Sequence, residues 1–307
     1  MTYTRAVALV VAGAFAAAAI VSARESDTQQ PRKLKVHISV DMEGVAGTVT
    51  ADQLGPAGFE YGRFREFMTK EALAAVLAAK EAGATAIVVA DAHGNGENLL
   101  IEQFPPDVKI VRAWPRKLQM MAGIDQTFDA AIYIGYHAST TNPTGVRAHT
   151  FSSATLAGVA LNGVNMTEGA WNAAIAGHFG VPVVMASGDD AALAEIRAVI
   201  GDIEGAETKT SLGFHSALTL TPQAALVEIS QKVKAGLARR ASMRPYKPQG
   251  ALVVDLTFKN YMPAEVLAYL PMFERTSAHA IRFRPKDMAE AAAVMEFIEE
   301  YRPDLTP

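Results

Sequence analysis

Short apolar runs alternate along this chain with longer stretches in which apolar residues recur at helical spacing. Residues 34–43, LKVHISVDME, are typical of a buried strand, and residues 61–83 show the pattern of an amphipathic helix ending at Gly83. The alternation continues, with strands predicted at 85–93, 107–114, 129–138, 181–188, 251–258 and 279–285, and helices at 168–179, 190–199, 222–240, 263–270 and 286–301. Strands that alternate with helices favour a mostly parallel sheet covered by helices on both faces.

One segment departs from this alternation. Residues 153–166, SATLAGVALNGVNM, contain two alternating runs around the dipeptide Asn162-Gly163, which strongly favours a two-residue hairpin turn. We therefore predict a three-layer α/β/α fold, with a mostly parallel mixed sheet, this hairpin and a smaller C-terminal α+β portion. The main α/β domain is expected over 34–210, and residues 211–307 are expected to complete the fold.

The first residues follow a different pattern. Arg5 precedes an apolar run at 6–21, which ends in the small residues VSA that a signal peptidase recognises. We predict a signal peptide over 1–23 and a flexible lead at 24–33, and hence a periplasmic or secreted protein without stable membrane insertion. A retained membrane anchor is the alternative, although a run of sixteen residues is short for a bilayer span, which needs about 20.

Composition and motifs exclude several classes of function. The formal charge of −4 and the lack of a lysine or arginine run argue against nucleic acid as a partner. The chain has no cysteine, which excludes disulfides and thiol nucleophiles, and no G-x-S-x-G elbow for a serine nucleophile. The stretch HGNGEN at 93–98 lacks the third glycine of a dinucleotide loop, so its glycines are interpreted as allowing a sharp backbone turn.

Acidic and imidazole side chains recur where the predicted strands end. Asp41 and Glu43 follow the first strand, and their spacing puts both carboxylates on one face. Asp91 and His93 end the second strand, and His137 ends another. Ligands of an open parallel sheet bind beyond the carboxyl ends of its strands, so we expect these side chains to meet at one edge.

Glu168 opens the helix after the hairpin, with Thr167 as its expected N-cap, and completes a set of five candidate metal ligands: Asp41, Glu43, His93, His137 and Glu168. Carboxylates and imidazoles without a thiolate suit zinc or a similar first-row ion. Five ligands suit two ions about 3.5–4 Å apart that share a bridging carboxylate, and Asp41 is the expected bridge. Each residue alone has an ordinary alternative role in a cap or turn, so the prediction depends on their coincidence.

His149 lies twelve residues after His137, just before the hairpin. We consider it a candidate proton shuttle or transition-state stabiliser, with an ordinary surface histidine as the alternative. His37 shares the strand parity of Asp41 but lies about 13 Å upstream at strand rise, so we assign it to the core. The other histidines are interpreted as structural: His178, His215 and His279.

Eight short blocks follow one another over nearly all of residues 34–300: SVDMEG, DAH, GYHA, the GV and H of 145–149, the EG of 168–169, SGDD, FKNY and KDM. In this order and spacing they resemble the zinc-dependent D-aminopeptidases of the DppA type. The resemblance implies two zinc ions per subunit on the same five ligands, with His149 as the catalytic histidine. It also implies a ring-like homo-oligomer, acting on short peptides with an N-terminal D-residue such as D-alanine.

The predicted export signal departs from the cytoplasmic members of that family and suggests envelope peptides as substrates. We therefore expect an exported, D-stereospecific metallo-aminopeptidase. Two alternatives remain open. One is a non-catalytic periplasmic protein that binds metal or peptide, and the other is a two-metal phosphoester hydrolase, for which no arginine cluster is evident near the candidate ligands.

Overall fold

In the computed structural model, which describes residues 33–301, seven strands form the larger of two sheets. Their order is β3-β2-β1-β4-β7-β8-β9, and all neighbours are parallel except β8 and β9. The strands are β1 (Leu34–Val40), β2 (Ala84–Asp91), β3 (Val108–Val111), β4 (Ala130–Tyr136), β7 (Val183–Asp189), β8 (Glu204–Gly213) and β9 (Ser216–Thr219). The central strand β4 is buried along its whole length, as is typical of a parallel sheet covered on both faces.

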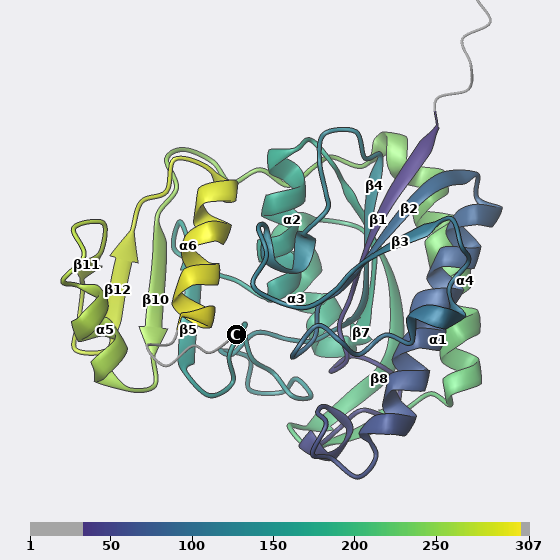
Figure 1. Ribbon diagram of the computed structural model, residues 1–307, viewed down its shortest axis with the longest axis horizontal. Coiled ribbons are helices and arrows are strands. Elements are labelled where there is room, and N and C mark those ends of the chain that lie inside the picture. Colours follow the sequence, from purple (N-terminus) through teal and green to yellow (C-terminus); the bar gives the residue numbers. More distant parts are fainter. Residues whose placement is uncertain (1–32, 302–307) are drawn as a thin grey trace, which may run out of the picture. The chain divides into compact units, whose positions relative to one another are not determined.

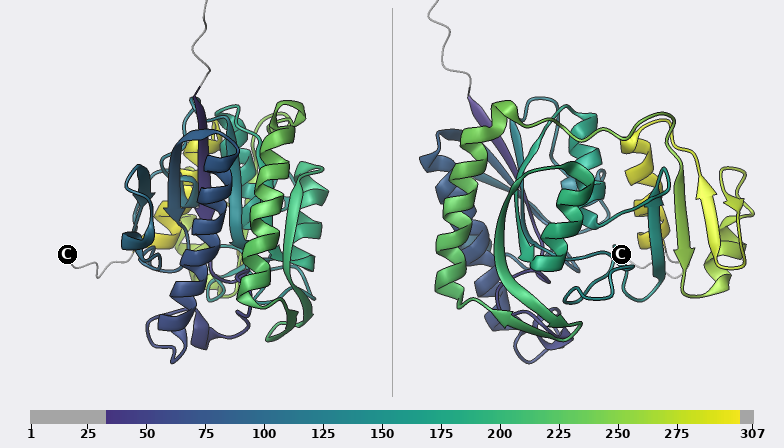
Figure 2. Two further views of the ribbon diagram at one scale, coloured as in Figure 1. Left: turned by 90° about the vertical axis from the view of Figure 1, so that its right-hand side faces the viewer. Right: turned by 180° about the vertical axis from the view of Figure 1, so that it is seen from behind.

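Helices cover both faces of this sheet and give the fold three layers (Figures 1 and 2). On one face α1 (Tyr61–Glu81) packs against α4 (Pro222–Arg239), and on the other lie α2 (Glu168–His178) and α3 (Asp190–Ile200). Successive side chains of β4 point to opposite faces of the sheet. Ile132 and Ile134 belong to the core under α1 and α4, whereas Tyr133 belongs to the core under α2. The predicted fold class is confirmed.

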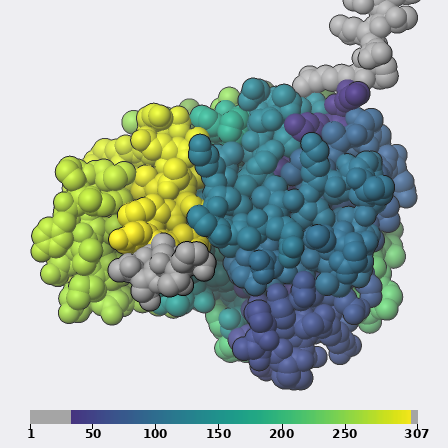
Figure 3. All heavy atoms as spheres, viewed as in Figure 1, coloured from purple at the N-terminus to yellow at the C-terminus, as the bar shows by residue number. Residues whose placement is uncertain are grey.

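The second sheet is antiparallel, with the order β11-β12-β10-β5-β6. Its strands are β5 (Leu156–Leu161), β6 (Val164–Asn165), β10 (Val254–Phe258), β11 (Glu274–Arg275) and β12 (Ala280–Phe283), and it carries α5 (Tyr261–Leu267) and α6 (Met288–Glu300). α6 contacts α2, and the apolar residues of the small sheet share one core with α2. Figure 3 shows α6, in yellow, lying against the blue-teal surface of the part of the molecule that contains the larger sheet.

The hairpin predicted around Asn162-Gly163 is present as β5 and β6. Both turn residues have positive φ, 51° for Asn162 and 78° for Gly163, which is the conformation that a tight two-residue turn needs. β5 pairs with β10, a strand that begins more than ninety residues later, so the hairpin belongs to the small sheet. The predicted boundary of the main domain, residue 210, lies inside β8.

β8 and β9 have no counterpart among the predicted strands. β8 has the sequence EGAETKTSLG, whose polar residues gave no apolar run to detect, and its partner β9 lies at the edge of the sheet. Short 3-10 helices occur at η1 (Ala51–Gln53), η2 (Ile101–Gln103), η3 (Gln119–Met121) and η4 (Arg240–Ser242). The predicted helix at 263–270 begins earlier than expected, at Tyr261, because Asn260 caps it by accepting from the Met262 amide.

The predicted signal peptide over 1–23, and all but the last residue of the lead at 24–33, lie outside the residues that the structure describes. Within residues 33–301, none of the helices combines the length and the apolar character needed to cross a membrane.

Candidate metal centre and active site

Three adjacent central strands deliver the candidate ligands to one edge of the large sheet. Asp41 and Glu43 follow β1, His93 follows its neighbour β2, and His137 follows β4 on the other side. Glu168 is the first residue of α2, whose N-cap Thr167 accepts from the Ala170 amide, as expected. All five side chains are buried, and the structure brings them together with His149.

Within this cluster Asp41 lies between two groups of residues. Its Oδ1 lies 3.2 Å from His93 Nδ1, which is also 2.8 Å from Glu43 Oε2. Its Oδ2 lies 3.3 Å from His137 Nε2, which is also 3.2 Å from Glu168 Oε2. The two oxygens of one carboxylate therefore face two sets of partners, each with one imidazole and one further carboxylate.

Both histidines are oriented by a backbone carbonyl on the far side of the ring. His93 Nε2 lies 2.7 Å from the carbonyl of Leu54, and His137 Nδ1 lies 3.0 Å from that of Ala138. A carbonyl can only accept, so these nitrogens donate, and in the neutral tautomer the opposite nitrogen turns its lone pair toward the carboxylates. This is the arrangement that proteins use to orient metal-binding histidines.

Several buried atoms at the centre of the cluster have no hydrogen-bond partner within the described part of the chain: Asp41 Oδ2, Glu43 Oε2 and His137 Nε2. Buried polar atoms are nearly always satisfied, so unpartnered ones that converge need another partner. Ligand atoms of Asp41, Glu43 and His137 lie within 4.8 Å of one another, as do those of His137, His149 and Glu168. The oxygen and nitrogen donors, their spacing and their missing partners fit divalent metal ions.

The electrostatics reflect three carboxylates in one buried site. Burial, followed by the charge of Glu43, raises the pKa of Asp41 to about 6. Burial alone would also raise the pKa of Glu43, but His93 beside it holds that pKa well below its usual range. His93 and His137 have raised pKa values despite their burial, because the adjacent carboxylates stabilise the charged rings. In the absence of metal, the site thus favours positive charge between its carboxylates.

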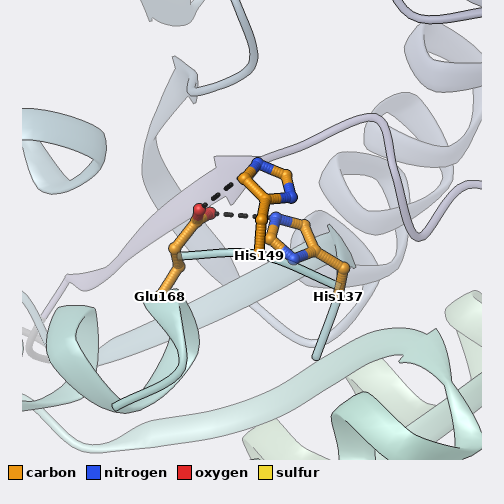
Figure 4. A group of neighbouring side chains, drawn as sticks. All are labelled: His137, His149 and Glu168. Carbon is orange, nitrogen blue, oxygen red and sulfur yellow. Dashed lines mark ion pairs between the residues drawn. The ribbon is translucent and has the colours of Figure 1, made fainter. Parts of the chain in front are cut away.

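His149 stands beside this cluster, stacked on a candidate ligand (Figure 4). Its ring centroid lies 4.1 Å from that of His137, and its Nε2 lies 3.8 Å from Glu168 Oε1. Its Nδ1 is 2.8 Å from the carbonyl of Arg147 and donates to it, which leaves Nε2 of the neutral ring with a lone pair. Burial and the neighbouring His137 lower the pKa of His149.

The loop that carries His149 is anchored from α3 and β8. Asp189, in the SGDD block, caps α3 through Ala192 and accepts from the Val146 amide at 2.7 Å with its second oxygen. The Arg147 amide donates to the carbonyl of Phe214 in the β8–β9 turn. The sequence alone marks SGDD only through the family resemblance, whereas the structure gives Asp189 a physical role in holding the loop of His149.

Asp91 and His37, two other polar residues near the strands, have separate roles. The Asp91 carboxylate accepts from the amides of Asn98 and Leu99 at 2.6 and 2.7 Å, which ties back the glycine-rich turn. Gly94 and Gly96 have positive φ there, as the interpretation of HGNGEN required. His37 is fully buried and lies 3.0 Å from the carbonyl of Ala122, so its assignment to the core is confirmed.

A cleft of about 260 Å³ opens over the cluster. Four of the five candidate ligands line it: Asp41, Glu43, His93 and Glu168. Trp114 and three glutamates of α6 also line it: Glu296, Glu299 and Glu300. No lysine or arginine is among the described residues that line it. Sequence reasoning missed the α6 glutamates, because acidic residues on a C-terminal helix look like an ordinary solvated face.

A family model described as D-aminopeptidase matches residues 34–297. The chain belongs to the D-aminopeptidase family. This D-aminopeptidase family member is 31% identical over 271 residues to the D-aminopeptidase of Bacillus subtilis (strain 168), covering 87% of this chain and 97% of that protein. The predicted resemblance and the expected class of enzyme, an aminopeptidase, are confirmed.

The fold also matches a solved structure of the family, a Zn-dependent D-aminopeptidase DppA from Bacillus subtilis described as a self-compartmentalizing protease. The TM-score is 0.84 at 29% sequence identity, and the match covers 89% of this chain and 100% of that one. The range matched by the family model, residues 34–297, spans strands of both sheets.

Proposed function

We propose that this protein is an exported D-aminopeptidase that uses two zinc ions to hydrolyse short peptides or amides with an N-terminal D-residue, of the D-alanine type. One observation carries the proposal: the two carboxylate oxygens of Asp41 face different histidines, Oδ1 facing His93 and Oδ2 facing His137. A single carboxylate between two ligand sets is what a pair of ions requires. The solved relative is described as zinc-dependent, which supports zinc as the metal.

One ion would be held by Asp41, Glu43 and His93, and the other by Asp41, His137 and Glu168. Bound there, such ions lower the pKa of water toward neutrality and polarise a carbonyl, which is the chemistry that amide hydrolysis needs. The protein's own part is to present the lone pairs of His93 and His137, fixed by the carbonyls of Leu54 and Ala138. The buried walls keep bulk water from competing for these ligands.

His149 moves a proton in this proposal. Its Nδ1 hydrogen is held by the Arg147 carbonyl, so Nε2 is the atom that faces the reacting groups. Nε2 accepts a proton when water attacks the scissile carbonyl and donates it to the departing amine. This favours the shuttle role over the oxyanion role, because a donor to an oxyanion would need Nε2 protonated from the start.

The charge of the cleft supports a substrate with a free amino group. Carboxylates of the candidate ligands and of α6 line it, without a lysine or arginine among the described lining residues. A peptide N-terminus is an ammonium and is attracted to such a cleft, whereas a phosphoester would be repelled. The phosphoester hydrolase alternative therefore lacks a partner for its phosphate.

Export and assembly complete the proposal. The apolar run at 6–21 and the small residues that follow it support cleavage after Ala23 and a role on envelope peptides. The relative described as a self-compartmentalizing protease supports a ring-like homo-oligomer for this chain. N-terminal sequencing of protein recovered from the periplasm or medium tests the first point, and light scattering on a size-exclusion column tests the second.

The activity is tested with paired substrates. Purified mature protein is expected to release product from D-alanyl amides faster than from L-alanyl amides, to lose activity in a chelator and to regain it with zinc. Elemental analysis should find two zinc ions per chain. Mass spectrometry after incubation with D-Ala-D-Ala shows whether the dipeptide is hydrolysed. If the protein binds the dipeptide but leaves it intact, it is a carrier protein instead.

A further inference from the structure

Lys209 is a fully buried lysine on β8 whose ammonium holds the loop that follows β1. Its Nζ donates to the carbonyls of Glu43, Val45 and Thr48, at 2.5, 3.0 and 2.6 Å. An ammonium has three hydrogens, so all its donors are used within this one loop. The first of the three acceptors is the backbone of a candidate metal ligand.

Other side chains hold further backbone groups of the same loop. Thr208 Oγ1 donates to the carbonyl of Gly44 at 2.6 Å, and the Ala46 amide donates to the buried carboxylate of Glu71 at 2.9 Å. The Gly47 amide donates to Thr219 Oγ1. The backbone of residues 43–48 is thus held by side chains on β8, β9 and α1. The Gly44 amide adds one backbone bond, to the carbonyl of Gly135 on β4.

A buried lysine carries a free-energy cost that a buried apolar side chain does not. Burying an ammonium is unfavourable unless its hydrogens are all bonded, and an apolar side chain would pack the same volume without that cost. Lys209 is only 2% exposed, and it directs every donor at main-chain oxygens of 43–48. Its arrangement is therefore suited to fixing a backbone path more than to packing.

We propose that Lys209 is a positioning residue of the metal centre, which fixes the backbone of 43–48 and so aims the carboxylate of Glu43 at His93. The proposal builds on the two-ion function above. It predicts an effect on one half of the site, because His137 and Glu168 come from β4 and α2, which Lys209 does not contact through any of its three bonds.

The test compares Lys209→Met with Thr210→Ala, the next residue on β8, whose hydroxyl bonds Glu207 on the same strand. Zinc is titrated into metal-free protein against a chromophoric chelator. In wild-type protein and in Thr210→Ala, two binding steps are expected. In Lys209→Met, one step should weaken by at least about tenfold while the other stays within about twofold, by analogy with lost outer-shell partners of metal ligands.

Hydrogen exchange provides a readout that needs no metal. In the presence of a chelator, peptides covering 43–50 should exchange at least about tenfold faster in Lys209→Met than in Thr210→Ala, with β4 and α2 unchanged. Unaltered exchange together with two wild-type binding steps would overturn the proposal. Equal weakening of both steps with general loss of protection would also overturn it, because that is the signature of a purely structural lysine.

If Lys209→Met does not fold, Lys209→Gln is measured in the same way, because its amide can still donate to part of the loop. A folded Lys209→Gln with both binding steps and exchange at wild-type values counts against the proposal. The proposed function fails separately, if the wild-type protein itself binds fewer than two ions. The metal-free exchange comparison then still decides whether Lys209 holds the loop.

Discussion

The rings of His137 and His149 are stacked nearly parallel, with centroids 4.1 Å apart and planes 8° apart. The free nitrogen of His137 lies 3.2 Å from Glu168 Oε2, and the free nitrogen of His149 lies 3.8 Å from Glu168 Oε1. The His149 amide also donates to the Ala138 carbonyl, so the two histidines are tied through adjacent backbone. A candidate ligand and a candidate proton carrier are therefore held in one rigid unit.

Replacing His149 by alanine should lower kcat by about 100-fold or more, because a positioned proton carrier typically contributes 10²–10⁴-fold. Zinc content should remain at the wild-type value, since the five other side chains still surround the ions. Steady-state kinetics with elemental analysis measure both, and His215→Ala, on the exposed β8–β9 turn, is the matched control. Full activity with intact metal would remove His149 from the mechanism.

Asp41→Asn and Glu43→Gln should differ in how many ions they lose. Asp41 faces both histidines, so its replacement should weaken both binding steps. The Glu43 carboxylate is paired with His93 at 2.8 Å, so its loss should weaken the step on the His93 side. The change at each affected step is expected to exceed about 100-fold, the upper end for outer-shell losses. Zinc per chain after dialysis measures this. Equal stoichiometry in the two variants would contradict the bridging role of Asp41.

Gly44→Ala should disturb the metal centre through the backbone. A Cβ at Gly44 would lie 2.1 Å from the carbonyl oxygen of Tyr136, next to His137, so β1's loop and β4 would be forced apart. A loss of stability of about 1–3 kcal/mol is expected from such overpacking, with reduced zinc binding. Gly55→Ala, where the added Cβ meets nothing within 4 Å, is the control. Denaturant unfolding and zinc titration would show the prediction wrong if the two variants behaved alike.

The stability of the metal-free protein should fall on acidification because of His37. Burial lowers the pKa of His37 to about 4, from about 6.5 in the unfolded chain, so the unfolded state takes up a proton first. The contribution of His37 is complete above pH 6.5 and is lost as the pH falls toward 4, by about 3 kcal/mol in total. Urea unfolding of wild type and His37→Gln at pH 7 and pH 5, in chelator, measures the difference. A pH dependence that is identical in the two proteins would refute it.

Much of the site could be predicted from local sequence. Asp41, Glu43, His93 and His137 each follow an apolar strand, and parallel strands bring their carboxyl ends to one edge. The Asn162-Gly163 turn was equally local, because two successive residues with positive φ define it. β8 was not predictable in this way, since its polar sequence becomes a strand only by pairing with β7 and β9.

By itself, the sequence determined which side chains reach the rim of the sheet, because strand periodicity and the order of elements depend on residues close together in the chain. Only the tertiary structure decided that the two oxygens of Asp41 point to different histidines, that Lys209 is bonded to the loop of Glu43, and that α6 closes the cleft with Glu296. Asp41 and His93 are 52 positions apart, and Lys209 and Glu43 are 166 positions apart. Such pairings are set by the packing of the whole core rather than by any local pattern.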